Sequence, residues 1–134
     1  MATNITLITD SLRLLNVISE SETPTAEQGS HALRRMNQML EAWEEDGIKL
    51  GYFAQSATGD TCPVPAYAEK GVTGMLAIDL APTYGAEPSA FCVKFADDGY
   101  QLILRKSVNA ALQPVDTRYL AGGSAYNIET DVGG

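Results

Sequence analysis

The chain has 134 residues, 45% of them hydrophobic, which is enough for one domain with a single core. Its 17 acidic and 9 basic side chains give a net charge of −8, which argues against a non-specific nucleic-acid-binding surface of clustered Lys and Arg. Two cysteines and one histidine are too few for a disulfide framework or a histidine-based zinc site. The N-terminus lacks the basic region of a signal peptide, and no apolar run approaches the roughly 18 residues of a membrane span. We therefore expect a protein made in a cytoplasm, with no metal, cofactor or membrane segment.

The first expected element is a helix over residues 4–19. Apolar residues recur there at helical spacing and share one face: Ile5, Ile8, Leu12, Leu15 and Ile18. The sequence Ser-Glu-Thr-Pro that follows is typical of a turn, because the residue before a proline is disfavoured in the helical region. The first helix should therefore end before Pro24.

A second amphipathic helix is expected within residues 23–47. Thr25 and Gln28 have the spacing of a capping box, and Gly47 can adopt the left-handed conformation that ends a helix. Its apolar face consists of Leu33, Met36, Leu40 and Trp43. The short connection predicts an antiparallel hairpin of the first two helices.

Residues 48–64 alternate apolar with polar or small side chains, which indicates a short strand or an extended arm followed by a loop. Pro65 suits the first turn of a third helix that reaches about Tyr84 and is stopped by Gly85. Its apolar face is predicted to be Val72, Met75, Leu76 and Leu80. Gly71 and Gly74 lower its helical propensity but would let another helix approach closely.

Pro88 opens a fourth predicted helix that ends near residue 110, with Gly99 as a weak point inside it. Its predicted apolar face consists of Phe91, Phe95, Leu102 and Val108, widened by Tyr100, Ile103 and Leu104. From Gln113 onward the helical periodicity vanishes. The predicted fold class is therefore all-α, a small bundle of about four helices with an extended arm or loop after the second helix and an irregular C-terminal tail.

The predicted division is a helical core of residues 1–112 and a C-terminal extension of residues 113–134. The extension is too short for a core of its own, yet it holds tyrosines and aliphatic residues that must pack on something. We expect it to dock on its own helices or on a neighbouring protein. The residues expected at that interface are Tyr119, Leu120, Tyr126, Asn127 and Ile128.

Acidic residues crowd the end of the second helix, where the helix dipole makes them mildly unfavourable. They are Glu41, Glu44, Glu45 and Asp46. A carboxylate pair could perform acid–base work, as in glycoside hydrolysis, but exposed acids are the favoured interpretation. Ser30 and His31 are neighbours on a helix and point about 100° apart, so they do not form a nucleophile–base pair. The sequence contains no phosphate loop, dinucleotide fingerprint or metal cluster, which favours a binding or structural protein over an enzyme.

One segment carries a resemblance to a known family. Residues 12–27 contain a helix, a turn ending in Glu-Thr-Pro and the start of a second helix, and they lead into Leu-Arg-Arg-Met-Asn-Gln-Met-Leu-Glu-Ala-Trp at residues 33–43. This hairpin resembles the N-terminal hairpin of the head-to-tail adaptor proteins of tailed bacteriophages, also called head-completion or packaged-DNA-stabilisation proteins. The resemblance is clearest over residues 1–50 and looser over residues 65–104. Residues 80–85 and 126–128 also look like that family.

The resemblance implies a structural protein that forms a ring, commonly a dodecamer, beneath the portal protein. Such a ring extends the DNA channel, retains packaged DNA and seats the tail, so the implied partners are portal, tail or stopper (nozzle) proteins and other copies. DNA would pass without sequence-specific binding, along an acidic face for which Glu44, Glu45 and Asp46 are candidates. The implied location is the virion neck, after assembly in the host cytoplasm.

Two other functions stay open from the sequence. One is a cell-wall (peptidoglycan) hydrolase that uses Glu41, Glu44 and Glu45. The other is a small helical regulatory or adaptor module in a bacterial cytoplasm.

Overall fold

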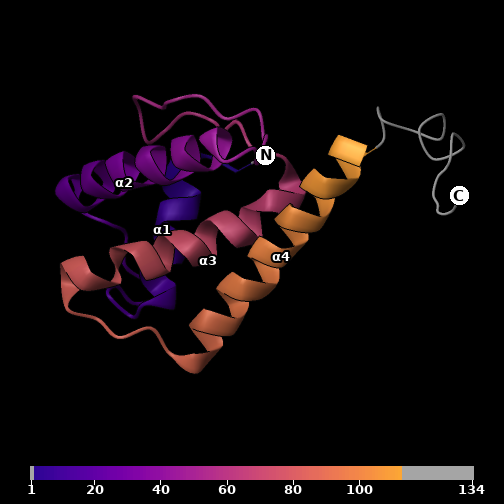
Figure 1. Ribbon diagram of the computed structural model, residues 1–134. Coiled ribbons are helices and arrows are strands. Elements are labelled where there is room, and N and C mark those ends of the chain that lie inside the picture. Colours follow the sequence, from indigo (N-terminus) through magenta and orange to yellow (C-terminus); the bar gives the residue numbers. More distant parts are fainter. Residues whose placement is uncertain (1, 113–134) are drawn as a thin grey trace, which may run out of the picture. The chain divides into compact units, whose positions relative to one another are not determined.

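The computed structural model describes residues 2–112, of which residues 2–104 group into one compact unit (Figure 1). The predicted all-α fold is confirmed. The described residues form four α-helices and two short 3-10 turns, and no strand occurs among them.

Helix α1 spans Asn4–Leu14 and is shorter than the predicted residues 4–19. Thr3 caps its beginning, where its side chain accepts from the N–H of Thr6. At its end Asn16 adopts a positive φ of 60°, and the N–H of Val17 donates to the carbonyl of Leu12 over 3.0 Å. This is the Schellman arrangement, with asparagine in the place that glycine usually takes. Leu15 and Ile18 follow the end of the helix but are still buried in the core, so apolar residues keep a helical spacing beyond the helix itself.

Helix α2 spans Ala26–Glu45, and its predicted capping box is confirmed. Thr25 Oγ1 accepts from the N–H of Gln28 over 3.1 Å, and Gln28 Oε1 accepts from the N–H of Thr25 over 2.9 Å. At the other end Gly47 has a φ of 94°, and the N–H of Ile48 donates to the carbonyl of Trp43 over 2.9 Å. The predicted face is buried, with Leu33, Met36, Leu40 and Trp43 all in the core.

Replacing Thr25 by alanine should lower the free energy of unfolding by about 1 kcal/mol, because both halves of the capping box are lost. Thr23→Ala is the matched control, since Thr23 is exposed and lies outside the helix. Urea denaturation followed by circular dichroism measures both. Equal midpoints for the two variants would contradict a stabilising cap.

The first two helices do not form the predicted antiparallel hairpin. An added Cβ on Gly29, in the first turns of α2, would lie 3.7 Å from Ile5 Cδ1 in the first turn of α1. The beginnings of the two helices therefore meet, whereas an antiparallel hairpin would bring the beginning of α2 to the end of α1. The connection between them is longer than predicted because α1 ends at Leu14.

Of the two predicted forms, a short strand or an extended arm, the segment after α2 adopts the extended arm (Figure 1). It returns to the start of α1, where Thr3 and Thr61 form an isolated antiparallel bridge. The N–H of Asn4 donates to the carbonyl of Asp60 over 2.9 Å, and that of Ile5 donates to the carbonyl of Thr58 over 2.8 Å. These are N–H groups of the first helical turn, which have no partner inside the helix. The arm thus completes the beginning of α1.

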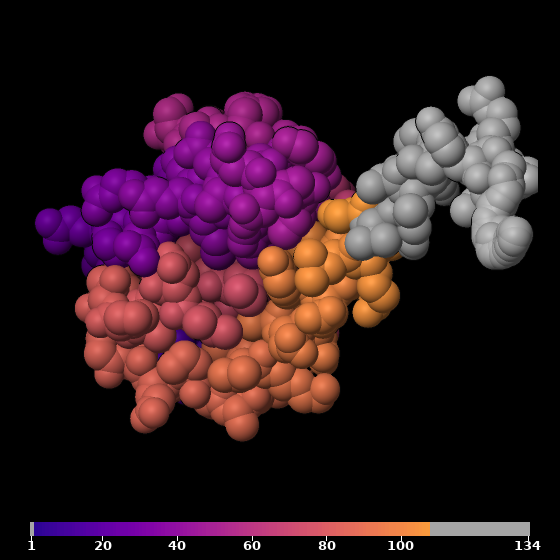
Figure 2. Space-filling model, viewed as in Figure 1, coloured from indigo at the N-terminus to yellow at the C-terminus, as the bar shows by residue number. Residues whose placement is uncertain are grey.

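Helix α3 (Glu69–Leu80) is the central element and packs against both α1 and α2. The 3-10 turns η1 (Ala66–Ala68) and η2 (Ala81–Tyr84) extend it at either end, so the predicted helix over residues 65–84 is confirmed with tighter first and last turns. Gly85 ends it with a φ of 61°. Its core residues Val72, Leu76 and Leu80 are fully buried. In the space-filling view α2 and the arm lie above α3 and the first part of α4 (Figure 2).

Helix α4 spans Ala90–Leu112 and begins after Ser89, whose Oγ accepts from the N–H of Cys92 over 3.1 Å. The predicted apolar face of α4 is wrong in part. Phe91 is 67% exposed, and the buried positions among residues 90–107 are Cys92, Ala96, Gly99 and Ile103. The predicted face residue Val108 lies outside the described side chains. Small residues take the inner face because α3 approaches too closely for a phenylalanine ring.

The close approach of α3 and α4 confirms the interpretation of the α3 glycines. An added Cβ on Gly71 would lie 2.8 Å from the carbonyl oxygen of Gly99, and one on Gly74 would lie 2.5 Å from the Cα of Ala96. Three glycines and one alanine thus bring the two backbones into contact. The α4 helix continues through Gly99, which serves this contact.

Candidate interaction surfaces

Of the residues considered for catalysis, His31 lies on α2 and contacts Thr83 and Arg34. His31 has its Nε2 3.3 Å from Thr83 Oγ1 and its Nδ1 3.2 Å from Arg34 Nη2. Residues 2–112 contain no group of three or more His, Cys, Asp and Glu side chains that could hold a metal ion. No helix in that range is long and apolar enough to cross a membrane.

Within the acidic cluster, Glu44 has a structural task. Its Oε2 accepts from the N–H of Leu50 over 2.7 Å, and its backbone carbonyl accepts from Lys49 Nζ over 2.9 Å. The side chain therefore holds the chain reversal between α2 and the arm. Glu41, Glu45 and Asp46 are exposed. Whether Glu44, Glu45 and Asp46 face a DNA channel stays a prediction.

The two cysteines are unpaired and buried, as expected from the sequence. Burial raises the pKa of the Cys62 thiol to about 11, and the nearby charge of Glu69 adds to this effect. The reactive thiolate form is therefore scarce at neutral pH.

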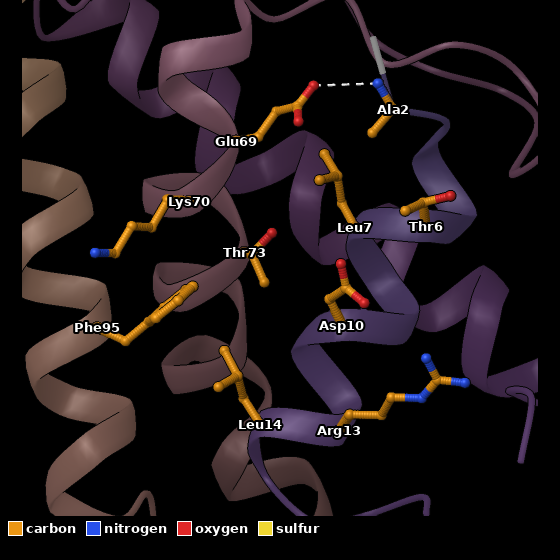
Figure 3. Close-up of a pocket in the computed structure, with 10 residues that line it drawn as sticks. All are labelled: Ala2, Thr6, Leu7, Asp10, Arg13, Leu14, Glu69, Lys70, Thr73 and Phe95. Atoms are coloured by element: carbon orange, nitrogen blue, oxygen red, sulfur yellow. Dashed lines mark hydrogen bonds between the residues drawn. The ribbon is translucent and has the colours of Figure 1, made fainter. Parts of the chain in front are cut away.

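An open groove of about 420 Å³ runs between α1 and α4, with α3 as its floor (Figure 3). Leu7 and Leu14 come from α1, Thr73 from α3 and Phe95 from α4. The complete lining consists of Ala2, Thr6, Leu7, Asp10, Arg13, Leu14, Glu69, Lys70, Thr73 and Phe95. The groove thus combines apolar side chains with a charged rim.

The rim carries Asp10 and Arg13 on α1 and Glu69 and Lys70 on α3. Glu69 Oε2 accepts from the N–H of Ala2 over 3.1 Å, and Lys70 Nζ lies 5.1 Å from the centre of the Phe95 ring. The side-chain ion pairs of the described residues lie elsewhere, at Arg35–Asp79 and Lys94–Asp98. Two acids and two bases therefore surround the groove without an ion-pair partner among residues 2–112.

A second surface is the arm around Phe53, a side chain that is 66% exposed. Buried amides fix this part of the arm. Asn37 Oδ1 accepts from the N–H of Gln55 over 2.8 Å and from the hydroxyl of Tyr52, while Asn37 Nδ2 donates to the carbonyl of Gln55 over 2.9 Å. Asn4 Nδ2 donates to Gln55 Oε1 over 3.0 Å. Burial raises the pKa of Tyr52, so its hydroxyl remains a donor.

The same network reaches Phe53 itself. Gln55 Nε2 donates to the carbonyl of Phe53 over 2.9 Å, and Asn4 Nδ2 also donates to the carbonyl of Ala57 over 2.9 Å. An irregular segment is thus held in one conformation from two helices, with its aromatic side chain directed to the surface. We call residues 51–58, held in this way, the Phe53 loop.

The outer side of α4 is the third apolar surface. Phe91 is 67% exposed, and its ring lies 6.0 Å from the Phe95 ring at the edge of the groove. Val93 is 49% exposed and, two positions further along the helix, lies on the opposite flank. The inner side of the helix is occupied by its contact with α3 and by Tyr100, whose ring lies 5.2 Å from that of Trp43. The helix therefore has apolar residues on both sides, one of them exposed.

The chain matches no protein-family model, and no curated protein matches it.

Sequence patterns missed the groove and the amide network. Asp10 and Arg13 lie off the apolar face of the first helix, and no local pattern marks them as part of a site. Asn37 and Gln55 are separated by 18 positions, a spacing that no local pattern detects. The predicted interface residues of the C-terminal extension, from Tyr119 to Ile128, lie outside the described residues.

Proposed function

We propose that this protein is a structural head-to-tail connector of a tailed bacteriophage, which binds beneath the portal as a ring and extends the DNA channel. Its role would be to retain packaged DNA and to seat tail or stopper proteins. The proposal joins the resemblance of the α1–α2 sequence to the properties of the surface. It involves no catalysis and no cofactor.

The observation that carries the proposal is apolar surface at separate places on the described residues: the groove, the Phe53 loop and the outer side of α4. Contiguous exposed apolar surface marks sites of interaction with other molecules. A ring subunit must contact two neighbours and the proteins above and below it, so it needs several such surfaces. The low share of charged residues, 19%, supports the same interpretation.

The C-terminal extension, residues 113–134, is proposed to contact the portal or the adjacent subunit, with Tyr119 and Tyr126 as aromatic anchors. We expect a chain ending at Gln113 to keep its helical circular-dichroism spectrum and to lose binding to portal rings of the same phage. A full-length Tyr119→Ala/Tyr126→Ala chain should bind more weakly by at least about tenfold. Native mass spectrometry of portal mixtures measures both.

The outcomes separate the parts of this proposal. If the shortened chain still saturates portal rings, the extension is not the anchor. If the full-length chain forms no ring-sized complex with portal, the connector function is wrong and the small regulatory module gains support. The hydrolase alternative is weakened by the engagement of Glu44 with Leu50, and absence of peptidoglycan cleavage by the full-length protein would end it.

A further inference from the structure

We propose that Phe53 of one copy of this chain inserts into the groove between α1, α3 and α4 of a second copy, in a head-to-tail contact. The inference deepens the connector function proposed above and rests on it for the ring in which such contacts would close. It concerns two surfaces, the Phe53 loop and the groove, for which the described residues provide no occupant.

The Phe53 loop is suited to act as the inserted part. Its ring is 66% exposed, while the backbone beneath it is fixed through Asn37, Gln55 and Asn4. A rigid aromatic side chain loses little conformational entropy on binding, which is why such residues dominate binding energy at interfaces. The amide network therefore prepares Phe53 for insertion into a partner.

The groove is suited to receive an aromatic ring. It is open, with a volume of about 420 Å³, and Leu7, Leu14 and Phe95 supply apolar contacts (Figure 3). The Phe95 ring can pair with an incoming ring edge to face, an arrangement that adds to simple burial. The groove thus offers both space and a partner of matching chemistry.

Charge favours a second copy as the occupant. Two copies that each carry −8 repel one another, so contact is most favourable where charge is absent or complementary. Residues 50–59 contain no charged side chain and are flanked by one cation, Lys49, and one anion, Asp60. The rim of the groove carries two acids and two bases without ion-pair partners among the described residues. Lys49 can face one of the acids while Asp60 faces one of the bases.

The two surfaces consist of different residues, as a head-to-tail contact requires. No residue of the Phe53 loop lines the groove. The loop is held by Asn37 on α2 and by Asn4, whereas the groove uses Asp10, Arg13 and their neighbours on α1. A contact between unlike surfaces leaves each pair of copies with one free loop and one free groove, so further copies can be added until the ring closes.

The test uses the full-length chain with one change on each surface. Phe53→Ala removes the inserted ring, and Asp10→Trp places a bulky side chain over the groove from an exposed position. Each should weaken self-association by at least about tenfold in sedimentation velocity over a series that reaches millimolar concentration. Glu27→Trp is the matched control and should associate like the wild-type protein, because Glu27 is also an exposed acid on a helix but does not line the groove.

Mixing the two variants gives the decisive result. A Phe53→Ala chain keeps an intact groove and an Asp10→Trp chain keeps an intact Phe53, so the mixture should form heterodimers of wild-type affinity and nothing larger. If the mixture associates no more than each variant alone, or if both variants associate like the wild-type protein, the proposal is overturned. A structural role for either residue would not produce this complementation.

If copies of the chain associate only when they are bound to the portal, a photo-crosslinking amino acid at position 53 tests the contact there. In portal-bound particles made from isotope-labelled and unlabelled chains, crosslinks should join position 53 to α1, α3 or α4 of another copy. The inference is overturned if position 53 crosslinks to the portal or to residues 113–134. It is also overturned if no crosslink joins two copies. If the chain binds the portal without the Phe53 contact, the inference fails and the connector function is unaffected. If free chains associate through Phe53 but do not bind the portal, the connector function fails and the Phe53 contact is unaffected.

Discussion

Replacing Gly99 by alanine should lower the free energy of unfolding by about 2–3 kcal/mol, although alanine is the better helix former by about 1 kcal/mol. The added Cβ would lie 2.5 Å from the nitrogen and 2.6 Å from the Cα of Gly71, and 2.8 Å from the carbonyl carbon of Lys70. All three are backbone atoms, so no side chain can rotate to relieve the clash. The two helices must move apart, which loosens the packing of Ile103 and Ala96 as well.

Gly29→Ala is the matched control for this prediction, because Gly29 is also a helical glycine. Its added Cβ would meet only Ile5 Cδ1 and Thr58 Cγ2, each at an ordinary distance of 3.7 Å. This variant should raise the free energy of unfolding by about 0.5–1 kcal/mol through helix propensity. Urea denaturation of the two variants should give shifts of opposite sign. Shifts of the same sign would show that the α3–α4 approach is not as close as described.

Replacing Asn37 by alanine should lower the free energy of unfolding by about 3 kcal/mol, because it leaves several buried polar groups without a partner. The amide of Asn37 serves the N–H and the carbonyl of Gln55 and the hydroxyl of Tyr52. Hydrogen exchange should also become faster at the backbone N–H of Gln55. The Phe53 loop would then lose its fixed conformation, so the same variant should weaken self-association.

Gln38→Ala is the control here, since Gln38 is the next residue on α2 and is exposed. It should change the free energy of unfolding by no more than about 0.5 kcal/mol. Unchanged exchange at Gln55 in the Asn37→Ala variant would contradict the assigned network, even if the variant were destabilised.

Local signals in the sequence predicted the elements where the physical cause is itself local. The capping box of Thr25 and Gln28 and the left-handed Gly47 are determined within one turn of the chain, and both were confirmed. The end of α1 was missed because Leu15 and Ile18 continue the apolar spacing after Asn16 has turned the backbone. Beyond Leu14 these apolar residues are still buried but no longer helical, and the spacing of apolar residues indicates only which residues are buried.

Tertiary packing decided what local pattern left open on α4. Phe91 and Phe95 are the most hydrophobic residues near its beginning, yet the core takes Cys92, Ala96 and Gly99. The reason lies on another helix, because Gly71 and Gly74 bring α3 so close that only small residues fit between the backbones. The Phe91 ring is therefore left exposed and the Phe95 ring lines the groove, and both become candidates for contact with another molecule.

The sequence by itself determined an all-α fold and the capped second helix, because these depend on residues close together along the chain. Only the tertiary structure decided which apolar residues are exposed, how Asn37 and Gln55 fix the Phe53 loop, and that α1, α3 and α4 enclose a groove. These features join residues from distant segments, and their geometry depends on how closely helices pack. The candidate interaction surfaces are of this second kind, since each is made by the packing of elements that no single stretch of sequence contains.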